Sequence, residues 1–338
     1  MISKHILLLL SATGAQVIWL ALRIPNIDLH ARVDDLVAQV PEGMITTYGE
    51  VAKALGDIVA SRFVGKVMSE NDDIVRVPCR RVVQSDGTLG GFTGEGGPQG
   101  KKKLLRAEGI DIERDRIVDF EKRLFTDFKT DYPLKKFKEI QIRDSKRLVL
   151  RDDFPGDSTV AGSDIAYIDD NAFGSMVIFD LKTRKPKEVV RTRANVSFPY
   201  IPTYLTFREA PVVEQLVRKA GCRPLLVHDG NGIIHPLGFG VASHIGVMLD
   251  LPTIGVAKKL LCGSVSGSGK FNEVKLRGRT LGYAVTGKGW SSPVYVSPGH
   301  RISVKSSIGF LKPYWHHRLP DPVRIAHIEA EKSRGAVG

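Results

Sequence analysis

The succession of strands and helices after residue 156 constrains the fold of this chain most strongly. Three consecutive stretches are typical of β-strands: residues 160–167, 175–181 and 189–196. A helix pattern follows, with Val213 and Leu216 on one face and Gly221 at its end. Residues 224–228 then form a short apolar run that is typical of a buried strand. Strands and helices in this order predict an α/β domain with a mixed central sheet.

The preceding residues, 28–110, have a different pattern of short helices around a glycine-rich loop. Four stretches are typical of helices: residues 29–40, 48–55, 60–69 and 101–108. Asp28 can cap the first of these, Pro41 ends it, and Gly56 closes the second. Residues 87–100 are rich in glycine and carry no periodicity. This pattern predicts a small α-helical, winged-helix-like domain that binds DNA.

The length of 338 residues and the change of pattern predict two domains. We expect five segments: an apolar leader at 1–24, a DNA-binding domain at 25–110, a charged linker at 111–131, an α/β domain at 132–330 and a tail at 331–338. Polar residues interrupt the leader, which falls short of the roughly 20 apolar residues that span a bilayer. A misassigned start codon or an additional packed helix therefore explains the leader better than an export signal.

An excess of positive charge indicates the kind of partner. Lys plus Arg exceed Asp plus Glu by 49 − 37 = 12, and the isoelectric point is near 9.6. A folded chain with this surplus favours a polyanion, so we expect a nucleic-acid partner, no membrane and no obligate protein partner. The three cysteines, Cys79, Cys222 and Cys262, are far apart and form neither a disulfide framework nor a zinc motif. This cysteine usage fits a reducing, cytoplasmic location.

A cysteine between a proline and two arginines marks a candidate site in the first domain. It lies in the run Pro78-Cys79-Arg80-Arg81. The neighbouring positive charge favours the nucleophilic thiolate, whereas a lone cysteine is more often a small buried apolar residue. Residues 24–110 resemble the active-site domain of the O6-alkylguanine-DNA alkyltransferases, whose own pattern is Pro-Cys-His-Arg-Val. The resemblance implies that Cys79 accepts an alkyl group from O6-alkylguanine in a single turnover.

The same resemblance implies roles for other residues of the domain. Tyr48 would contact the phosphate of the target nucleotide, and Arg62 would fill the hole left by the flipped base. Asn71 corresponds to a hinge residue, and Glu108 would complete the proton relay. Arg80 stands where the family has a histidine that takes the cysteine proton, and a guanidinium cannot act as a base. Alkyl transfer can therefore survive in weakened form or be lost, in which case the domain only binds damaged DNA.

Three carboxylates in the second domain are placed to form a metal site. Asp164 lies in the first strand pattern, Glu209 opens the helix after the third, and Asp229 ends the buried strand. If the fourth strand lies beside the first, the two aspartates meet at one sheet edge with Glu209 above them. Such a cluster suits Mg²⁺, with Mn²⁺ as the alternative, and can hold a phosphate and activate water. Three acids on a ribonuclease-H-like frame therefore predict a metal site.

Five short motifs surround these carboxylates. They are, in order, Phe198-Pro199-Tyr200-Ile201-Pro202, Phe207-Arg208-Glu209, Asp229-Gly230-Asn231-Gly232-Ile233-Ile234-His235-Pro236, Gly255-Val256-Ala257-Lys258-Lys259 and Val296-Ser297-Pro298-Gly299-His300-Arg301. Together they resemble endonuclease V over roughly residues 132–330. In that family the cut falls at the second phosphodiester 3′ to hypoxanthine and leaves 3′-hydroxyl and 5′-phosphate ends.

The resemblance implies a role for each motif. The metal ligands would be Asp164, Glu209 and Asp229, with His300 near the metal and Lys258 on the phosphate or the attacking water. The strand-separating wedge would be formed by Pro199, Tyr200, Ile201 and Pro202. The pocket for the flipped base would be lined by Gly230, Gly232 and His235. Three residues depart from the family pattern: Thr203 replaces a usual glycine, and His228 and Asn231 vary around the aspartate.

Both resemblances together predict a bifunctional DNA repair enzyme that acts on single- or double-stranded DNA. One half would remove alkyl groups from guanine, and the other would nick near deaminated adenine with Mg²⁺. Two alternatives stay open. The first domain can be a non-catalytic damage-binding module, and the nuclease can act on inosine-containing RNA, because no residue shows how 2′-hydroxyl groups are treated.

Overall fold

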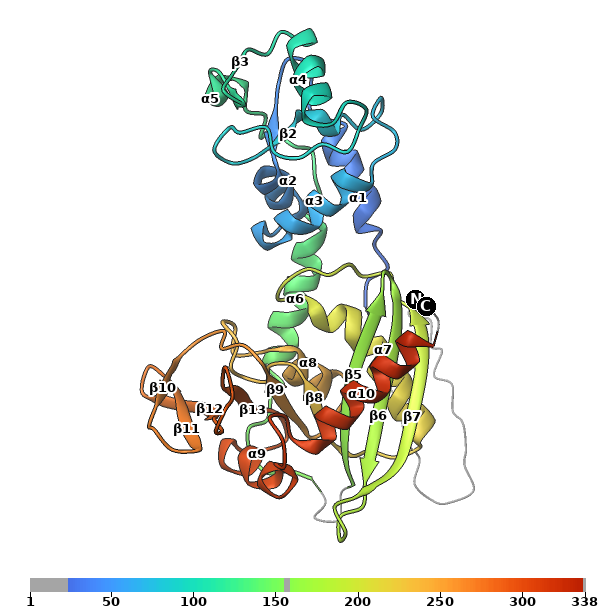
Figure 1. The fold of residues 1–338 in the computed structure, drawn as a ribbon, viewed down its shortest axis with the longest axis vertical. Coiled ribbons are helices and arrows are strands. Elements are labelled where there is room, and N and C mark those ends of the chain that lie inside the picture. Colours follow the sequence, from blue (N-terminus) through green and yellow to red (C-terminus); the bar gives the residue numbers. More distant parts are fainter. Residues whose placement is uncertain (1–23, 155–158, 337–338) are drawn as a thin grey trace, which may run out of the picture.

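The protein forms two domains that are stacked end to end in the computed structural model (Figure 1). The structure describes residues 24–154 and 159–336. The expected leader, apart from Ile24, lies outside these residues. Among the described residues, no helix is long and apolar enough to cross a bilayer.

The N-terminal domain is built from short helices. Its elements are α1 (Leu29–Val37), β1 (Thr46–Thr47), α2 (Tyr48–Leu55), η1 (Ile58–Ala60), α3 (Ser61–Glu70), η2 (Cys79–Arg81), β2 (Val82–Val83) and α4 (Gly97–Ala107). Asp28 caps α1 by accepting a hydrogen bond from the Ala31 amide at 3.0 Å, as the sequence predicted. Gly56 ends α2 with a φ of 113°, a value open to glycine at little cost. Helix α1 ends at Val37, before the expected end near Pro41.

The expected charged linker at 111–131 is not a free connection. Residues 112–123 form a hairpin and a short helix: β3 (Ile112–Glu113), β4 (Arg116–Ile117) and α5 (Phe120–Arg123). Ile112 and Ile117 are buried in a small core with Leu105 of α4. The Phe125 amide then donates to the Ile45 carbonyl at 2.7 Å. The sparse apolar residues of this charged segment thus attach it to the N-terminal domain, and the charges stay outside.

The C-terminal domain has the mixed central sheet that the sequence predicted. Its nine strands are β5 (Val160–Ile168), β6 (Asn171–Phe179), β7 (Pro186–Asn195), β8 (Leu225–Asp229), β9 (Thr253–Ala257), β10 (Ser264–Ser266), β11 (Phe271–Leu276), β12 (Arg279–Val285) and β13 (Val294–His300). They lie in the order β10-β11-β12-β13-β9-β8-β5-β6-β7. Strand β8 pairs in parallel with β5 and β9, whereas β5, β6 and β7 are antiparallel. This arrangement matches the expected ribonuclease-H-like frame.

Helices cover both faces of this sheet (Figure 1). They are α6 (Pro133–Ser145), α7 (Leu205–Ala220), α8 (Val241–Leu249), α9 (Val304–Leu311), η3 (Lys312–Tyr314) and α10 (Asp321–Gly335). Alternate residues of β5 face different helices: Ala161 packs with α7, and Ala166 packs with Ala330 of α10. A Cβ at Gly162 would lie 1.9 Å from the Pro322 carbonyl oxygen, so this glycine lets α10 approach the sheet. The expected tail from residue 331 is helical to Gly335 as part of α10.

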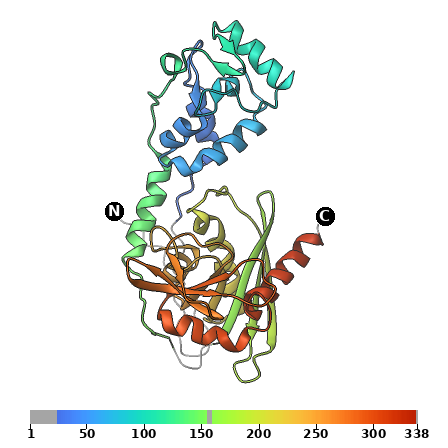
Figure 2. The ribbon, with the colours of Figure 1, turned by 60° about the vertical axis from the view of Figure 1, so that its left-hand side comes forward.

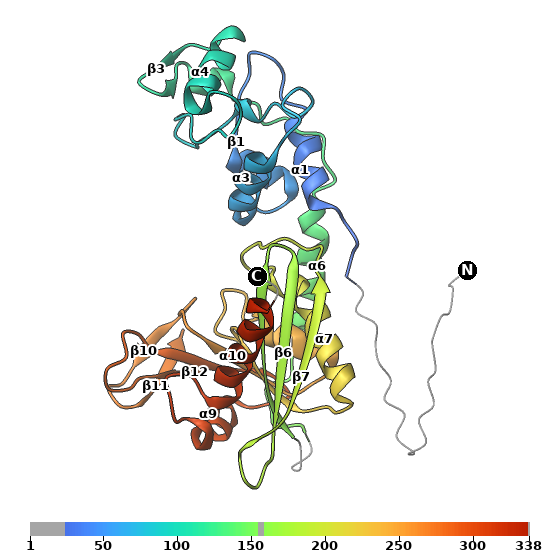
Figure 3. The same ribbon diagram turned by 45° about the vertical axis from the view of Figure 1, so that its right-hand side comes forward.

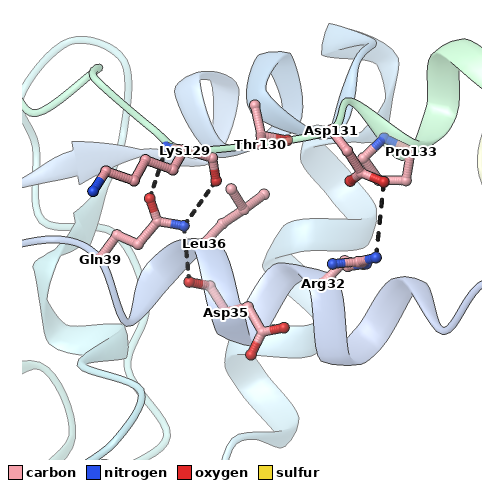
Figure 4. A pocket seen from close by; sticks show the side chains of 8 residues that line it. All are labelled: Arg32, Asp35, Leu36, Gln39, Lys129, Thr130, Asp131 and Pro133. Atoms are coloured by element: carbon pink, nitrogen blue, oxygen red, sulfur yellow. Dashed lines mark hydrogen bonds and ion pairs between the residues drawn. The ribbon is translucent and has the colours of Figure 1, made fainter.

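Residues 125–132 connect the domains along the side of α1, and α6 then leads into the C-terminal domain (Figures 2 and 3). Gln39, in the turn after α1, holds this connection with both atoms of its side-chain amide, accepting from the Lys129 amide at 2.8 Å and donating to the Lys129 carbonyl at 3.1 Å. A pocket of about 390 Å³ lies here, between α1 and residues 129–133 (Figure 4). None of the residues predicted for either site lines it.

Candidate active sites

Asp164 and Asp229 meet at the sheet edge, as their places in the sequence predicted. Strands β5 and β8 pair in parallel with Ser163 opposite His228, which puts the two aspartates side by side. His327 of α10 joins them, because one ligand atom of each of the three side chains lies within 4.8 Å of the others. The Nδ1 atom of His327 is 2.6 Å from Oδ2 of Asp164. This group can hold a divalent cation.

The charges around the two aspartates favour a bound cation. Burial, and then the nearby charge of Asp229, raise the pKa of Asp164 above its ordinary value. Lys258, which directly follows β9, places its Nζ 2.8 Å from Oδ2 of Asp229. Its side chain is 43% exposed, so the ammonium can also reach a phosphate in solvent. Two close carboxylates, whose charge the partly exposed Lys258 neutralises only in part, are suited to a hard cation.

Glu209 does not join the two aspartates, contrary to the expectation of a three-acid cluster. Neighbouring strand residues point to opposite faces of a sheet, so His228 faces α7 while Asp229 faces α10. His228 shares hydrogen bonds with Oε2 of Glu209 at 2.7 Å and with Oγ of Ser163 at 2.8 Å. Burial alone would lower the pKa of His228, but the hydrogen bond with Glu209 raises it. The departure at His228 thus holds Glu209 on the α7 side.

His300 also lies away from the two aspartates. It ends β13 opposite Thr253 at the start of β9, whereas Asp229 pairs with Val256 near the end of β9. Its Nδ1 accepts a hydrogen bond from the Val149 amide at 3.2 Å. The structure therefore brings His327, not His300, to the metal-site candidates. A signal for His327 was present in the sequence, because Val323, His327 and Ala330 share one face of a helix at positions i, i+4 and i+7.

The predicted wedge is a loop before α7 with an exposed aromatic residue. Tyr200 is 66% exposed, while its neighbour Ile201 is fully buried. Thr203 closes the loop with a φ of 69°, in the left-handed region that favours glycine. Its carbonyl accepts a hydrogen bond from Nε2 of Gln141 at 2.6 Å. Its hydroxyl is buried and has no hydrogen-bond partner among the described residues. The replacement of the family's usual glycine therefore puts strain at the base of the loop.

We expect Thr203→Gly to raise the free energy of unfolding by about 1 kcal/mol. The change removes roughly 1–2 kcal/mol of left-handed backbone strain and an unpaired hydroxyl, offset by the greater backbone entropy of glycine. Thermal unfolding should show a midpoint about 2–4 °C higher. The matched control is Thr206→Gly inside α7, which should lower the midpoint. An unchanged or lower midpoint for Thr203→Gly would contradict the strain at this residue.

The glycines after Asp229 pack closely against protein backbone and side chains. A Cβ at Gly230 would lie 2.1 Å from Val241, and one at Gly232 would lie 2.2 Å from the Pro298 carbonyl oxygen. These glycines therefore hold the loop tightly on α8 and β13. His235 follows in the same loop, and burial lowers its pKa to about 4. It is therefore neutral at physiological pH and offers both a donor and an acceptor.

Some of the residues predicted for the N-terminal site lie near Cys79. The thiol is 6% exposed, in the core formed by α1, α2 and α3. Burial, and then the nearby Cys79, raise the pKa of Tyr48. Asn71 donates to the Val77 carbonyl at 2.9 Å, which fixes the turn before Cys79. Arg62 is exposed on α3.

Glu108 binds two arginines at this site. Its Oε1 accepts from Nε of Arg80 at 2.5 Å, and its Oε2 accepts from Nε of Arg81 at 2.7 Å. Burial opposes ionisation, but the hydrogen bonds from Arg81 and Arg80 hold the pKa of Glu108 below its ordinary value. Arg80 also donates to the Ile74 carbonyl at 2.9 Å. Arg80 therefore occupies the carboxylate that would complete the relay, and it offers no site for a proton.

Lys101 is a candidate that the sequence reasoning missed. It is fully buried, and its Nζ donates to the carbonyls of Val82 at 2.7 Å and Leu89 at 2.6 Å. Burial lowers its pKa to about 8, although the nearby Cys79 opposes this shift. Its ammonium, held by backbone carbonyls, places a positive charge near the buried thiol, and such a charge favours the thiolate. Its only sequence signal was a lysine at the start of a helix after a glycine loop.

The fold and the two sites define a nuclease with an acidic metal site, joined to a DNA-binding domain with a cysteine site. The model of the endonuclease V family matches residues 143–328, and that of the 6-O-methylguanine DNA methyltransferase DNA-binding domain matches residues 28–110. Relatives named bifunctional methyltransferase/endonuclease align with 89% of this chain at 36% and 37% identity, so the chain belongs to that family of DNA repair enzymes. The predicted fold class and both resemblances are thereby confirmed.

Relatives and a solved structure are similar over long stretches. The bifunctional methyltransferase/endonuclease of Picrophilus torridus is 37% identical over 302 residues, which cover 89% of this chain and 95% of that protein. The protein of the same name from Thermoplasma volcanium is 36% identical over 303 residues, 89% of each chain. Endonuclease V of Ciona intestinalis, solved with DNA containing an inosine, superposes with a TM-score of 0.56 at 25% identity and covers 62% of this chain and all of that one.

Proposed function

We propose that the C-terminal domain cuts DNA that contains hypoxanthine, at the second phosphodiester on the 3′ side of that base. The observation that carries this proposal is the meeting of Asp164, Asp229 and His327 at the sheet edge, with Lys258 beside them. The Ciona intestinalis homologue was solved with inosine-containing DNA, which supports the same lesion for this chain. The products would carry 3′-hydroxyl and 5′-phosphate ends.

The donor atoms at this site fit Mg²⁺, with Mn²⁺ as the alternative. Asp164 and Asp229 supply the oxygens that these hard cations prefer, and the nitrogen of His327 is a ligand that Mn²⁺ accepts more readily. A bound cation would polarise the scissile phosphate and lower the pKa of a water molecule. Lys258 would add positive charge beside the phosphate. Glu209 would hold His228 from the α7 side and would not itself bind the cation.

The lesion would be reached by separating the strands and extruding the base. Tyr200, held between Pro199 and Pro202 and 66% exposed, is suited to replace a base in the stack. The neutral His235 and the loop of Gly230 and Gly232 would line the pocket for the extruded base. We keep His300 outside the catalytic residues, because it lies at the far end of β9.

For the N-terminal domain we propose transfer of an alkyl group to Cys79. The sulfur attacks the alkyl carbon, and the bond from that carbon to O6 of guanine breaks. The thiol proton ends on the guanine that has lost its alkyl group. Tyr48 would contact the phosphate of the flipped nucleotide, Arg62 would fill the hole left by its base, and Asn71 would keep the turn before Cys79 in place. The free thiol of Cys79, which the transfer requires, favours a reducing, cytoplasmic setting.

A non-catalytic N-terminal domain is the second candidate, and one observation favours it. Arg80 binds Glu108 where a histidine would connect that carboxylate to the thiol. One experiment separates the candidates: the protein is incubated with a duplex carrying O6-methylguanine with a labelled methyl group. Label on Cys79 supports transfer, whereas binding of the duplex without label supports a damage-binding module. In parallel reactions, DNA and RNA strands that contain inosine test whether the protein is a nuclease and whether it cuts DNA or RNA.

We expect Arg80→His to speed alkyl transfer near neutral pH by about 10²-fold, the lower range of general-base catalysis. Histidine would accept the thiol proton, and Glu108 would remain held by Arg81 at 2.7 Å. The check is the single-turnover rate of label transfer as a function of pH. The matched control is Arg80→Lys, which keeps the positive charge but restores no base, and should not be faster. Equal rates for wild type and Arg80→His would contradict the missing-base explanation.

A further inference from the structure

We infer that the N-terminal domain supports the wedge of the nuclease, so that nicking of duplex DNA depends on a contact between the domains. The contact joins Tyr204, just after the wedge, to Asp57, in the turn between α2 and α3. Tyr204 and Asp57 are positioning residues in this account. The inference rests on the proposed nuclease function. It gives the N-terminal domain a role that is independent of alkyl transfer to Cys79.

A partly buried hydrogen bond makes this contact. The hydroxyl of Tyr204, a fully buried residue, donates to Oδ2 of Asp57 at 2.8 Å. Lys138 of α6 places its Nζ 3.6 Å from the same carboxylate oxygen. The other carboxylate oxygen of Asp57 accepts from the Val59 amide at 3.2 Å and so begins the helical turn before α3. One aspartate therefore links the residue just after the wedge, α6 and the turn that leads into α3, the helix that carries Arg62. Charge-assisted hydrogen bonds of this kind are among the stronger ones.

Apolar packing continues the contact on both sides. Ile201 of the wedge and Phe198 before it share one buried cluster with residues of α1, α2 and α3. Phe137 of α6 lies in the middle, with its ring centroid 4.9 Å from those of Phe198 and Phe207. Because one core includes both domains and the wedge, a movement of the N-terminal domain would disturb the wedge loop.

The loop is fixed at its base and free at its tip. Gln141 of α6 holds the Thr203 carbonyl, Tyr204 is bonded to Asp57, and Ile201 is buried, whereas Tyr200 is 66% exposed. A side chain that must enter a base stack needs such a rigid support. The N-terminal domain supplies one of the attachments through the turn that precedes Arg62. DNA held by this domain would therefore meet a wedge whose position is already set.

The test measures kcat/KM for nicking of a duplex with one inosine and of the same strand unpaired, with the full-length protein and Mg²⁺. Only the duplex requires strand separation. Tyr204→Phe removes one hydroxyl and should lower the duplex value about tenfold, as expected for a partly buried hydrogen bond to a charged group, while leaving the single-strand value unchanged. Asp57→Ala should lower kcat/KM on the duplex in the same way. Asp57→Asn keeps an acceptor oxygen for the Tyr204 hydroxyl, so its kcat/KM on the duplex should stay close to that of the wild type. Tyr200→Ala serves as the reference for loss of the wedge.

Two controls separate positioning from general damage to the fold. Tyr283→Phe removes a tyrosine hydroxyl from β12, elsewhere in the sheet. It should change kcat/KM on neither the duplex nor the single strand. Thermal unfolding shows whether each variant is folded. Equal losses on both substrates, or no loss on the duplex, would overturn the inference while wild-type nicking keeps the proposed function intact. Failure of the wild type to nick either substrate would overturn the proposed function and the inference together.

Discussion

Asp229→Asn and Asp164→Asn are each expected to lower inosine-dependent nicking by at least about 10²-fold and to leave alkyl transfer to Cys79 unchanged. Loss of a residue that only orients a metal ligand already costs 10- to 100-fold, so loss of the ligand itself should cost more. Asparagine keeps the shape and removes the charge that attracts the cation. The two sites lie in different domains, so the transfer reaction is an internal test that the variant protein is folded.

The measurement is the single-turnover rate of nicking in Mg²⁺, with label transfer from O6-methylguanine measured on the same preparations. The matched control is Asp180→Asn, in the exposed turn between β6 and β7, which should nick at the wild-type rate. His327→Ala should also weaken nicking, whereas His300→Ala should affect it much less. Nicking that persists in both aspartate variants in the presence of EDTA would show that the metal assignment is wrong.

Cys79→Ala is expected to remove alkyl transfer entirely, because no other residue of the described site offers a sulfur nucleophile. Cys222 and Cys262 lie in the other domain and are the matched controls, so Cys222→Ala and Cys262→Ala should retain full transfer. Binding to the methylated duplex should persist in Cys79→Ala, since Tyr48 and Arg62 are untouched. The readout is label retained on the protein after denaturation. Label retained by Cys79→Ala would place the acceptor elsewhere.

The sequence predicted the two aspartates because their positions depend on backbone pattern alone. Asp164 lies in a long and largely buried strand, and Asp229 ends a short apolar strand, so the parallel pairing of β5 with β8 was sufficient to bring them together. Glu209 could not be placed in this way. Its carboxylate is bound by His228, and no pattern in the sequence reveals which partner a buried acid chooses.

The choice between two histidines needed the three-dimensional structure. His300 lies in a conspicuous motif, yet the antiparallel pairing of β13 puts it at the opposite end of β9 from Asp229. His327 lies in a helix of ordinary composition that crosses the sheet beside Asp164. The position of His327 depends on how α10 packs over the backbone of Gly162. Such packing is a tertiary property that the sequence pattern does not reveal.

The junction of the domains was the least predictable part. Residues 111–131 carry many charges, which is typical of a linker, but a few isoleucines suffice to fold their first half onto the N-terminal domain. The contact between Tyr204 and Asp57 joins residues 147 positions apart, and neither residue belongs to a motif that indicates an interface. Lys101 was missed for a similar reason, because its burial becomes visible only once the glycine loop is folded around it.

The most direct test of the account is the position and metal dependence of the cut in a duplex with one inosine, labelled on the inosine strand. The account predicts a single Mg²⁺-dependent cut at the second phosphodiester on the 3′ side of the inosine. The products should have a 3′-hydroxyl that a polymerase extends and a 5′-phosphate, and EDTA or Asp229→Asn should prevent the cut. Cutting at another position, cutting of the matched duplex with guanine in place of inosine, or cutting that continues in EDTA would contradict it.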